Sequence, residues 1–170
     1  MSPPDKDLAN SPLVRGEEMA TDYVLDSQVG FILRQASQRH AALFAALMGV
    51  ETTPMQWAAL AKLREIGPTS QNQLGRMTAM DVATIKGVVD RLMKRGLVRS
   101  MADEGDARRR LLALSEEGRT FVEANVMTAH AITRETLAPL TEREKALFVA
   151  LLGKLSGSVG APSSEGVPSP

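Results

Sequence analysis

The segment that most constrains the fold is residues 69–114, where two short helical patterns are followed by two apolar stretches around a charged turn. Ser70 and Gln73 have the spacing of a capping box, which predicts that the first helix begins at Ser70. A turn follows at residues 78–80, and Asp81 is a good N-cap for the second helix. Two helices joined by so tight a turn indicate a helix-turn-helix unit.

The second helix, residues 82–95, has two unlike sides and ends at Gly96, a residue that commonly closes helices. Helical spacing gathers its apolar residues into one stripe, which we expect to be buried: Val82, Ile85, Val89 and Leu92. The opposite side begins with small residues and ends basic: Ala83, Thr84, Lys86, Gly87, Asp90, Arg91 and Lys94. Because a side without bulk permits close approach, the first turns of this helix are suited to enter a major groove of DNA.

A β-hairpin is predicted directly after the second helix. Residues 97–101 and 110–114 read as strands, and residues 102–109 between them form a charged tip around Gly105. Such a wing can reach a minor groove, where the negative potential of a narrow groove favours arginine. The segment therefore predicts a winged helix-turn-helix, and the whole chain a mainly α fold with a small β-hairpin wing.

The formal net charge of the 170-residue chain is zero, which at first argues against nucleic acid as a partner. The distribution of charge reverses that argument, because residues 62–110 hold eleven Lys or Arg and six Asp or Glu, a local charge of +5. Residues 1–61 carry −3 and residues 111–170 carry −2. A basic middle between acidic flanks indicates a DNA-contacting module. The alternative, a merely solvated face, explains the charges but not their location.

Helical patterns with apolar stripes flank this segment. The long helix predicted at residues 22–49 has the stripe Val29, Ile32, Leu33, Ala36, His40, Leu43, Phe44 and Leu47. The helix that opens at Thr53-Pro54 has the stripe Met55, Ala59, Leu63 and Ile66. The helix capped by Ser115 and ended by Pro139 has the stripe Val122, Val126, Ala129, Thr133 and Leu137. The last helix, which starts with the capping box Thr141 to Glu144, repeats Leu147, Phe148, Leu151, Leu152 and Leu155.

These helices predict the domain organisation. Residues 53–114 form the winged helix-turn-helix lobe, and residues 22–49 with 115–156 form a helical dimerisation region, since a compact winged helix does not need three further helices to cover it. The alternative is that these outer helices cover the core of their own domain. Residues 1–21, rich in Pro, Asp and Ser, are expected to be a flexible arm, and residues 157–170, rich in Gly, Ser and Pro, a disordered tail.

Residues 53–120 resemble the multiple-antibiotic-resistance regulator (MarR) family of winged helix-turn-helix repressors. The resemblance rests on Gln73-Leu74-Gly75, Val88-Val89-Asp90-Arg91-Leu92, Lys94-Arg95-Gly96-Leu97-Val98, Asp106-Ala107-Arg108 and Leu114-Ser115-Glu116-Glu117-Gly118. In the family the wing arginine enters the minor groove and the wing aspartate orients it, which implies these roles for Arg108 and Asp106. The middle position is often basic, so Ala107 leaves a phosphate contact either missing or supplied by Arg109.

The resemblance also implies a homodimer, built from the outer helices, that binds a pseudo-palindromic double-stranded DNA operator. The residues predicted to contact DNA are Ser70, Gln71, Ala83, Thr84, Lys86, Gly87, Arg91, Asp106, Arg108 and Arg109.

Motifs for catalysis and for cofactors are missing from the sequence. It has no cysteine, no Gly-rich phosphate loop, no nucleophile elbow and no metal-ligand spacing of histidines. We therefore expect no enzyme activity, no catalytic residue, no cofactor and no metal. The rival hypothesis is a helical protein-interaction module that binds no DNA. The sequence has no apolar run of membrane-span length and no signal-peptide pattern, which predicts a cytoplasmic protein without a membrane partner.

A candidate effector site comes from His40, on the apolar stripe of its helix, and Trp57, which lies off the stripe of its own helix. His40 is either a hydrogen-bonded core residue or part of a pocket lining, and Trp57 is plain core, the wall of a ligand pocket or a subunit contact. In the MarR family, small aromatic acids bind between the dimer helices and the DNA-binding lobe. A planar acid needs flat walls and one or two cationic or N–H donors. The predicted ligand-binding set is therefore Arg34, His40, Phe44 and Trp57.

Residues 26–44 and 83–92 are similar to repressors of nicotinate catabolism, whose inducer is a hydroxylated nicotinic acid, and this implies 6-hydroxynicotinate as an effector. A salicylate-like or phenolic inducer is the alternative. The sign of regulation, repression or activation, also stays open, because the sequence predicts binding and not its consequence.

Overall fold

The computed structural model describes residues 23–103, 105–106 and 108–157. The arm predicted at residues 1–21 and nearly all of the predicted tail lie outside the described residues. The elements are the 3₁₀ turn η2 (Leu25–Ser27), helices α1 (Val29–Met48), α2 (Pro54–Ile66), α3 (Gln71–Met77) and α4 (Val82–Lys94), strands β1 (Val98–Ala102) and β2 (Arg110–Leu114), and helices α5 (Glu116–Thr136) and α6 (Glu142–Leu155). The prediction of a mainly α chain with one β-hairpin is confirmed.

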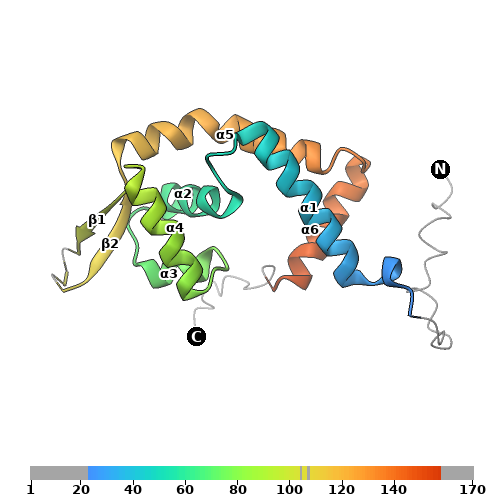
Figure 1. Cartoon of the computed structure of the whole chain (residues 1–170), viewed down its shortest axis with the longest axis horizontal. Coiled ribbons are helices and arrows are strands. Elements are labelled where there is room, and N and C mark those ends of the chain that lie inside the picture. The colour runs from blue at the N-terminus through green and yellow to red at the C-terminus, as the bar shows by residue number, and fades with distance from the viewer. Residues whose placement is uncertain (1–22, 104, 107, 158–170) are drawn as a thin grey trace, which may run out of the picture.

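Helix α5 runs along the molecule and joins its two ends (Figure 1). At one end, α2, α3, α4 and the hairpin form a lobe, and at the other end lie α1 and α6. Polar contacts fasten α1 to the end of α5, because the Arg39 guanidinium donates to the main-chain oxygens of Thr136 (2.8 Å) and Glu135 (3.3 Å). The lobe and the α1–α6 end are thus held apart by one long helix.

One apolar core holds the lobe together. Its largest fully buried side chains are Leu60, Leu74, Ile85, Val88, Val89, Leu92 and Val122. Three of the four residues of the stripe predicted for α4 belong to this core, but Val82 is 69% exposed, so its predicted burial is wrong. Val82 lies on the inward side of α4 but in its first turn, which projects beyond the core, and Val88 completes the buried side instead.

Helix α4 ends in a glycine turn that determines where β1 begins. Gly96 has a φ of 71°, its N–H donates to the Met93 carbonyl (2.9 Å), and the Leu97 N–H donates to the Leu92 carbonyl (3.0 Å). This is the hydrogen-bond pattern of a Schellman motif. Because Leu97 closes the helix, β1 starts at Val98 and not at residue 97 as the sequence predicted.

The two strands pair in antiparallel fashion, with Val98 opposite Leu114 and Ala102 opposite Arg110. Thr69, just before α3, joins this sheet by an isolated bridge, exchanging main-chain hydrogen bonds of 3.0 and 2.8 Å with Leu112. The wing is therefore connected directly to the start of the helix-turn-helix, which makes the lobe a winged helix-turn-helix.

Helix α1 starts later than the sequence predicted, and fewer of its residues are buried. The helix expected at residues 22–49 is interrupted at Gln28, whose backbone is extended (φ −80°, ψ 127°). The side chains of Ser27 and Gln28 both donate to the Val24 carbonyl, at 2.9 and 3.1 Å, and this stabilises the break. Of the predicted stripe only Phe44 is buried, and α6 has no buried residue at all.

The predicted stripes of α2 and α5 are correct only in part. Met55 is 53% exposed while Leu60, outside the predicted stripe, is fully buried. In α5, Ile132 is buried where the stripe had assigned Thr133, which is exposed. In both helices the buried side overlaps the predicted stripe, at Ala59, Leu63 and Val122, and extends to a neighbouring position, because it follows the packing of the lobe rather than the most regular apolar spacing.

Helix caps agree closely with the sequence. The capping box predicted at Thr141 and Glu144 is confirmed, and its hydrogen bonds lower the pKa of the Glu144 carboxyl group below the usual value. A second box, which the sequence analysis did not predict, closes the start of α2: the Thr53 hydroxyl accepts from the Gln56 N–H (3.2 Å) and the Gln56 amide oxygen accepts from the Thr53 N–H (3.0 Å).

Candidate functional site

The turn between α3 and α4 brings the two helices into close contact. Ser70 caps α3 by accepting from the Gln73 N–H at 3.4 Å, but the reciprocal bond seen in α2 and α6 is not formed, so the predicted capping box is half complete. Ala79 takes a left-handed conformation (φ 53°), which sharpens the turn. Gly75 lets α4 approach, since a Cβ there would lie 3.1 Å from Cγ2 of Ile85.

Asp81 holds the first turn of α4 in place. Its Oδ1 accepts from the Thr84 N–H and its Oδ2 accepts from the Thr84 hydroxyl, both at 2.8 Å. The backbone bond from Thr84, followed by the hydroxyl bond, lowers the pKa of the Asp81 carboxyl group. The proton of the Thr84 hydroxyl is thereby committed, which leaves its oxygen free to accept a further hydrogen bond.

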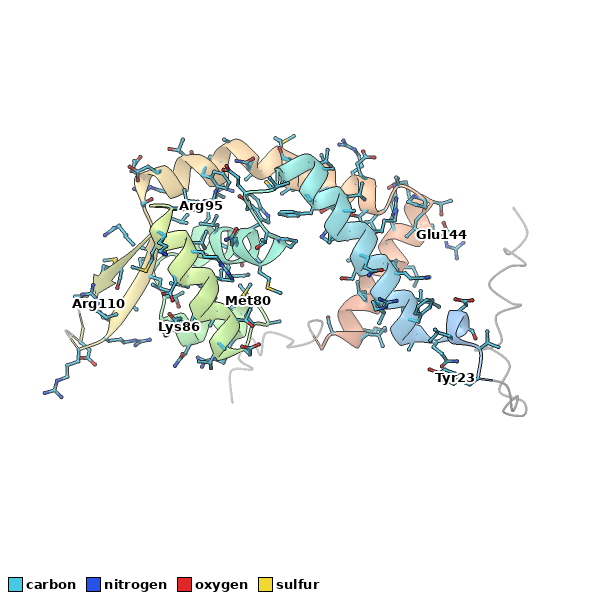
Figure 2. The ribbon with its side chains drawn as sticks, viewed as in Figure 1. Tyr23, Met80, Lys86, Arg95, Arg110 and Glu144 are labelled. Carbon is cyan, nitrogen blue, oxygen red and sulfur yellow. The ribbon has the colours of Figure 1, made fainter. Side chains whose placement is uncertain are left out.

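The outward side of α4 is small at its N-terminal end and cationic farther along. Ala83 and Lys86 are exposed, Thr84 and Gly87 are half-buried, and Arg91 is exposed. Figure 2 shows Met80 and Lys86 toward the free end of this helix and Arg95 at its other end. Val82, which sequence reasoning placed in the core, is also exposed in the first turn of this helix.

The tip of the wing is shaped by its two aspartates. Asp106 Oδ1 accepts from the Arg108 N–H (3.0 Å), and the Asp106 carbonyl accepts from the Arg109 N–H (2.8 Å). Asp103 pairs with Arg109, with Oδ2 and Nε 3.6 Å apart. The Arg108 guanidinium is exposed and has no hydrogen bond or ion pair within the described residues. Asp106 therefore orients Arg108 through the backbone and leaves its guanidinium available.

The C-terminal end of α4 is tied to the rest of the chain by Arg95. Its guanidinium donates to the Glu51 carbonyl (2.8 Å) and the Thr52 hydroxyl (3.4 Å), and lies 5.6 Å from the ring centre of Phe121. These contacts join α4 to the α1–α2 loop and to α5, beside which Arg95 lies in Figure 2.

A cleft of about 540 Å³, the α1–α4 cleft, opens between α1, the α1–α2 loop, α2 and α4. Its lining residues are Ser37, His40, Ala41, Glu51, Thr53, Pro54, Met55, Gln56, Val88 and Arg91. The cleft is large enough for a small organic ligand. Its walls come both from α1 and from α4, the helix whose outward side is described above.

His40 is held in the α1–α4 cleft by a chain of hydrogen bonds. The Thr136 hydroxyl donates to the Ile132 carbonyl (2.8 Å), so its oxygen accepts from Nδ1–H of His40 (2.9 Å). In the neutral imidazole this assigns the proton to Nδ1 and leaves Nε2 as an acceptor. The His40 ring also lies 6.4 Å from the ring of Phe44, tilted by 57°.

The other three predicted ligand residues do not line this cleft. Phe44 is 4% exposed and lies behind His40. Trp57 packs against the core of the lobe. Arg34 is exposed, with its guanidinium 5.3 Å from the ring centre of Phe31 in the same helix. The structure brings Arg91 into the cleft instead, a residue that the sequence analysis had assigned to DNA.

The described part of the chain contains no group of three or more His, Cys, Asp or Glu side chains that could hold a metal ion. Nor does any helix within it have the length and apolar character needed to cross a membrane.

Fold and site together define a winged helix-turn-helix protein in which one side of the second helix is exposed, an exposed arginine lies at the wing tip, and a ligand-sized cleft lies behind that helix. The chain belongs to the MarR family, whose sequence profile matches residues 52–109. The HTH-type transcriptional repressor NicR of Pseudomonas putida is 37% identical to it over 139 residues, which cover 81% of this chain and 88% of NicR. The family resemblance inferred from the sequence motifs is therefore confirmed.

Solved structures agree with this assignment. A probable transcriptional regulator from Pseudomonas aeruginosa is 57% identical, with a TM-score of 0.76 over 78% of this chain and 99% of that one. BpsR of Bordetella bronchiseptica, described for the regulation of its DNA binding by 6-hydroxynicotinic acid, is 38% identical, with a TM-score of 0.76 over 79% of this chain and 97% of that one. The relatives are regulators of transcription and not enzymes.

Sequence reasoning missed several residues of this region. Val82 was missed because periodicity alone does not show where a core ends. Thr53, Gln56 and Arg91 were missed as cleft residues because only the fold brings them to His40. The capping-box spacing of Thr53 and Gln56 could have predicted the start of α2 but not the cleft, and nothing local in the sequence points to Arg91.

Proposed function

We propose that the protein is a ligand-responsive transcriptional repressor that binds a pseudo-palindromic operator as a homodimer and is released by a small aromatic acid. The observation that carries the proposal is the position of the α1–α4 cleft: its walls belong both to α1, in the proposed dimerisation region, and to α4, the proposed recognition helix. A ligand there contacts both parts of the molecule. Since such a protein acts on chromosomal DNA, the proposal includes a cytoplasmic location.

In the proposed complex, the first turns of α4 lie in the major groove. Val82 and Ala83 offer apolar contact to thymine methyl groups, and the Thr84 oxygen, whose proton is committed to Asp81, accepts from a base amino group. Lys86 supplies a cation to a phosphate or a base edge. We keep Ser70, Gln71, Gly87 and Arg91 as further contacts at the groove, and Asp106, Arg108 and Arg109 as the wing contacts.

The homodimer is proposed from the exposed apolar side chains of α1 and α6. A groove of about 230 Å³ between the two helices is lined by Val29, Ile32, Leu33, Phe148, Leu151, Leu152 and Leu155. A helix without buried residues, such as α6, gains little stability from packing within its own chain. Residues 22–49 and 115–156 therefore serve as the dimerisation region. Two lobes related by a twofold axis would read half-sites about 10 bp apart.

The proposed effector is a planar acid that carries a hydrogen-bond donor on its ring. Nε2 of neutral His40 accepts from a ring hydroxyl or ring N–H, and Arg91 neutralises the carboxylate. Glu51 also lines the cleft, so a ligand with a donor fits better than one with acceptors alone. A hydroxylated nicotinic acid meets these requirements, and the similarity to NicR and BpsR supports 6-hydroxynicotinate in particular.

We propose that the ligand releases DNA because ligand and DNA favour different positions of α4. A ligand that joins α1 to Arg91 favours one spacing of the two recognition helices over the other, and it removes a cation from the DNA surface. A salicylate-like acid is the second candidate, because its phenolic hydroxyl also donates next to a carboxylate. If the protein activates transcription instead of repressing it, the proposed DNA and ligand contacts stay the same.

Footprinting on the region upstream of the protein's own gene tests the proposal. We expect protection of two half-sites related by a dyad, with hydroxyl-radical cleavage reduced in the minor groove where each wing lies. Arg108→Ala should lose the minor-groove protection, and Arg143→Ala, an exposed arginine of α6, should keep it. A protein that protects no upstream DNA, at any salt concentration that preserves its fold, would favour the interaction-module hypothesis.

A further inference from the structure

Arg95 is the C-cap residue of α4 and continues the side of that helix that faces the α1–α4 cleft. Val88 and Arg91 line the cleft from α4, and Arg95 follows them at helical spacing with an αR backbone (φ −82°, ψ 0°). Arg95 itself does not line the cleft, and it is not among the residues predicted to contact DNA. Operator binding and effector binding, as proposed above, therefore leave this arginine without a role.

The Arg95 guanidinium holds the middle of the α1–α2 loop. Its Nη1 donates to the Glu51 carbonyl (2.8 Å), and Nη1 and Nη2 both lie 3.4 Å from the hydroxyl oxygen of Thr52. Thr52 is 4% exposed, and its hydroxyl has no other hydrogen-bond partner in the described part of the chain. The planar guanidinium, which also lies near the Phe121 ring, thus bonds two neighbouring loop residues at once.

The loop that Arg95 holds also forms a wall of the α1–α4 cleft. Glu51 and Thr53, on either side of Thr52 in the chain, both line the cleft. At the α1 end of the loop, Gly49 has a φ of 84°, a conformation that favours glycine. The loop is thus fastened to α4 by Arg95 and joined to α1 through a glycine, so a ligand in the cleft contacts a wall that is bonded to the end of the proposed recognition helix.

We propose that Arg95 is a positioning residue, which couples a ligand in the α1–α4 cleft to the position of α4 relative to α1. The inference rests on the ligand-responsive function proposed above and assigns a residue that carries the response. A ligand held by α1 draws Glu51 and Thr53 into a new position, and the Arg95 hydrogen bonds require α4 to follow the loop. Without these bonds the loop adjusts by itself, by rotation at Gly49. Direct contact of the ligand with Arg91 then carries only part of the response.

The test measures a release factor, which is the operator Kd at saturating 6-hydroxynicotinate divided by the operator Kd without the acid. Arg95→Gln should lower this factor by about threefold or more. Its affinity for the acid, measured by calorimetry without DNA, should stay at the parent value, because Arg95 does not line the cleft. Thr52→Val removes one acceptor of the same contact and should also lower the release factor. Added to Arg95→Gln, it should lower the factor no further, because both substitutions break one interaction.

Arg99→Gln is the matched control. Arg99 is an exposed arginine of the same lobe and makes no hydrogen bond or ion pair with any residue that the structure describes. The control loses the same charge, so it should change operator affinity as much as Arg95→Gln does and keep the parent release factor.

An Arg95→Gln protein that the acid releases as it releases the parent overturns this inference alone. The inference is also overturned if Arg95→Gln loses affinity for the acid, or loses more operator affinity than Arg99→Gln, because Arg95 would then contact the ligand or the DNA. If circular dichroism shows that Arg95→Gln does not fold, an unchanged release factor in Thr52→Val overturns it. A parent protein that the acid does not release from the operator overturns the proposed function, and this inference with it.

Discussion

The substitution Leu151→Asp probes the proposed dimer interface directly. Leu151 lies in the groove between α1 and α6 and is 48% exposed in the single chain. Complete burial of a leucine is worth about 1.5–3 kcal/mol, so covering the remaining half contributes about 1 kcal/mol per subunit. A buried carboxylate without a partner costs about 1–3 kcal/mol more in each subunit.

Because both subunits carry the change, these terms give about 4–8 kcal/mol for the dimer. Dimerisation should therefore weaken by roughly 10³- to 10⁶-fold. Sedimentation equilibrium measures this shift, and circular dichroism shows whether the monomer keeps its helices. Operator affinity should fall together with the dimer population.

Ala146→Asp is the matched control. Ala146 is exposed and lies about 140° around α6 from Leu151, so it faces away from the groove. It introduces the same charge into the same helix and should leave the dimer intact. A Leu151→Asp protein that sediments as a dimer and binds the operator as the parent does would refute the reasoning, and the interface would lie elsewhere.

Three further predictions concern the lobe. Arg108→Ala should weaken operator binding by about 1–3 kcal/mol and lower the slope of its salt dependence by about 1, measured by fluorescence anisotropy between low and moderate salt; an unchanged slope would remove the wing from the mechanism. Gly118→Ala places a Cβ 2.0 Å from the Leu97 carbonyl oxygen, so the free energy of unfolding in urea should fall by about 3 kcal/mol or more, and a stable variant would contradict this close approach. The lowered pKa of Asp81 means that its cap stabilises α4 above the unfolded pKa and is lost as pH falls through the folded value; carboxyl NMR should therefore show Asp81 titrating below an unfolded peptide, and Thr84→Ala should move the value back up.

Local signals predicted the helix ends and the wing well. Gly96 ends α4, and the box at Thr141 starts α6, because capping depends on a few neighbouring residues and on backbone conformation. The position of a core is not a local property. Val82 continues the stripe of α4 in sequence, yet it lies beyond the side chains that would have covered it.

The candidate site was less predictable for the same physical reason. The hydrogen bond that fixes the His40 ring comes from Thr136, 96 residues away in the chain, and no local pattern links the two. Arg91 has the sequence position of a DNA contact, and only the attachment of α1 to α5 beside the lobe places it at the cleft. The sequence shows the apolar stripe of α1, but such a stripe does not specify whether residues of the same chain or of a second copy cover it.

The affinity for the operator, measured with and without 6-hydroxynicotinate, tests the central claim most directly. Fluorescence anisotropy of labelled operator DNA should show that the acid weakens binding by the parent protein about 5–150-fold, the usual range of coupling between two sites. His40→Ala should bind the operator as the parent does and lose the response, because the ligand loses its acceptor in the α1–α4 cleft. Equal release of the parent and of His40→Ala by the acid would place the effector site elsewhere. A parent protein whose operator affinity the acid leaves unchanged would contradict regulation by 6-hydroxynicotinate.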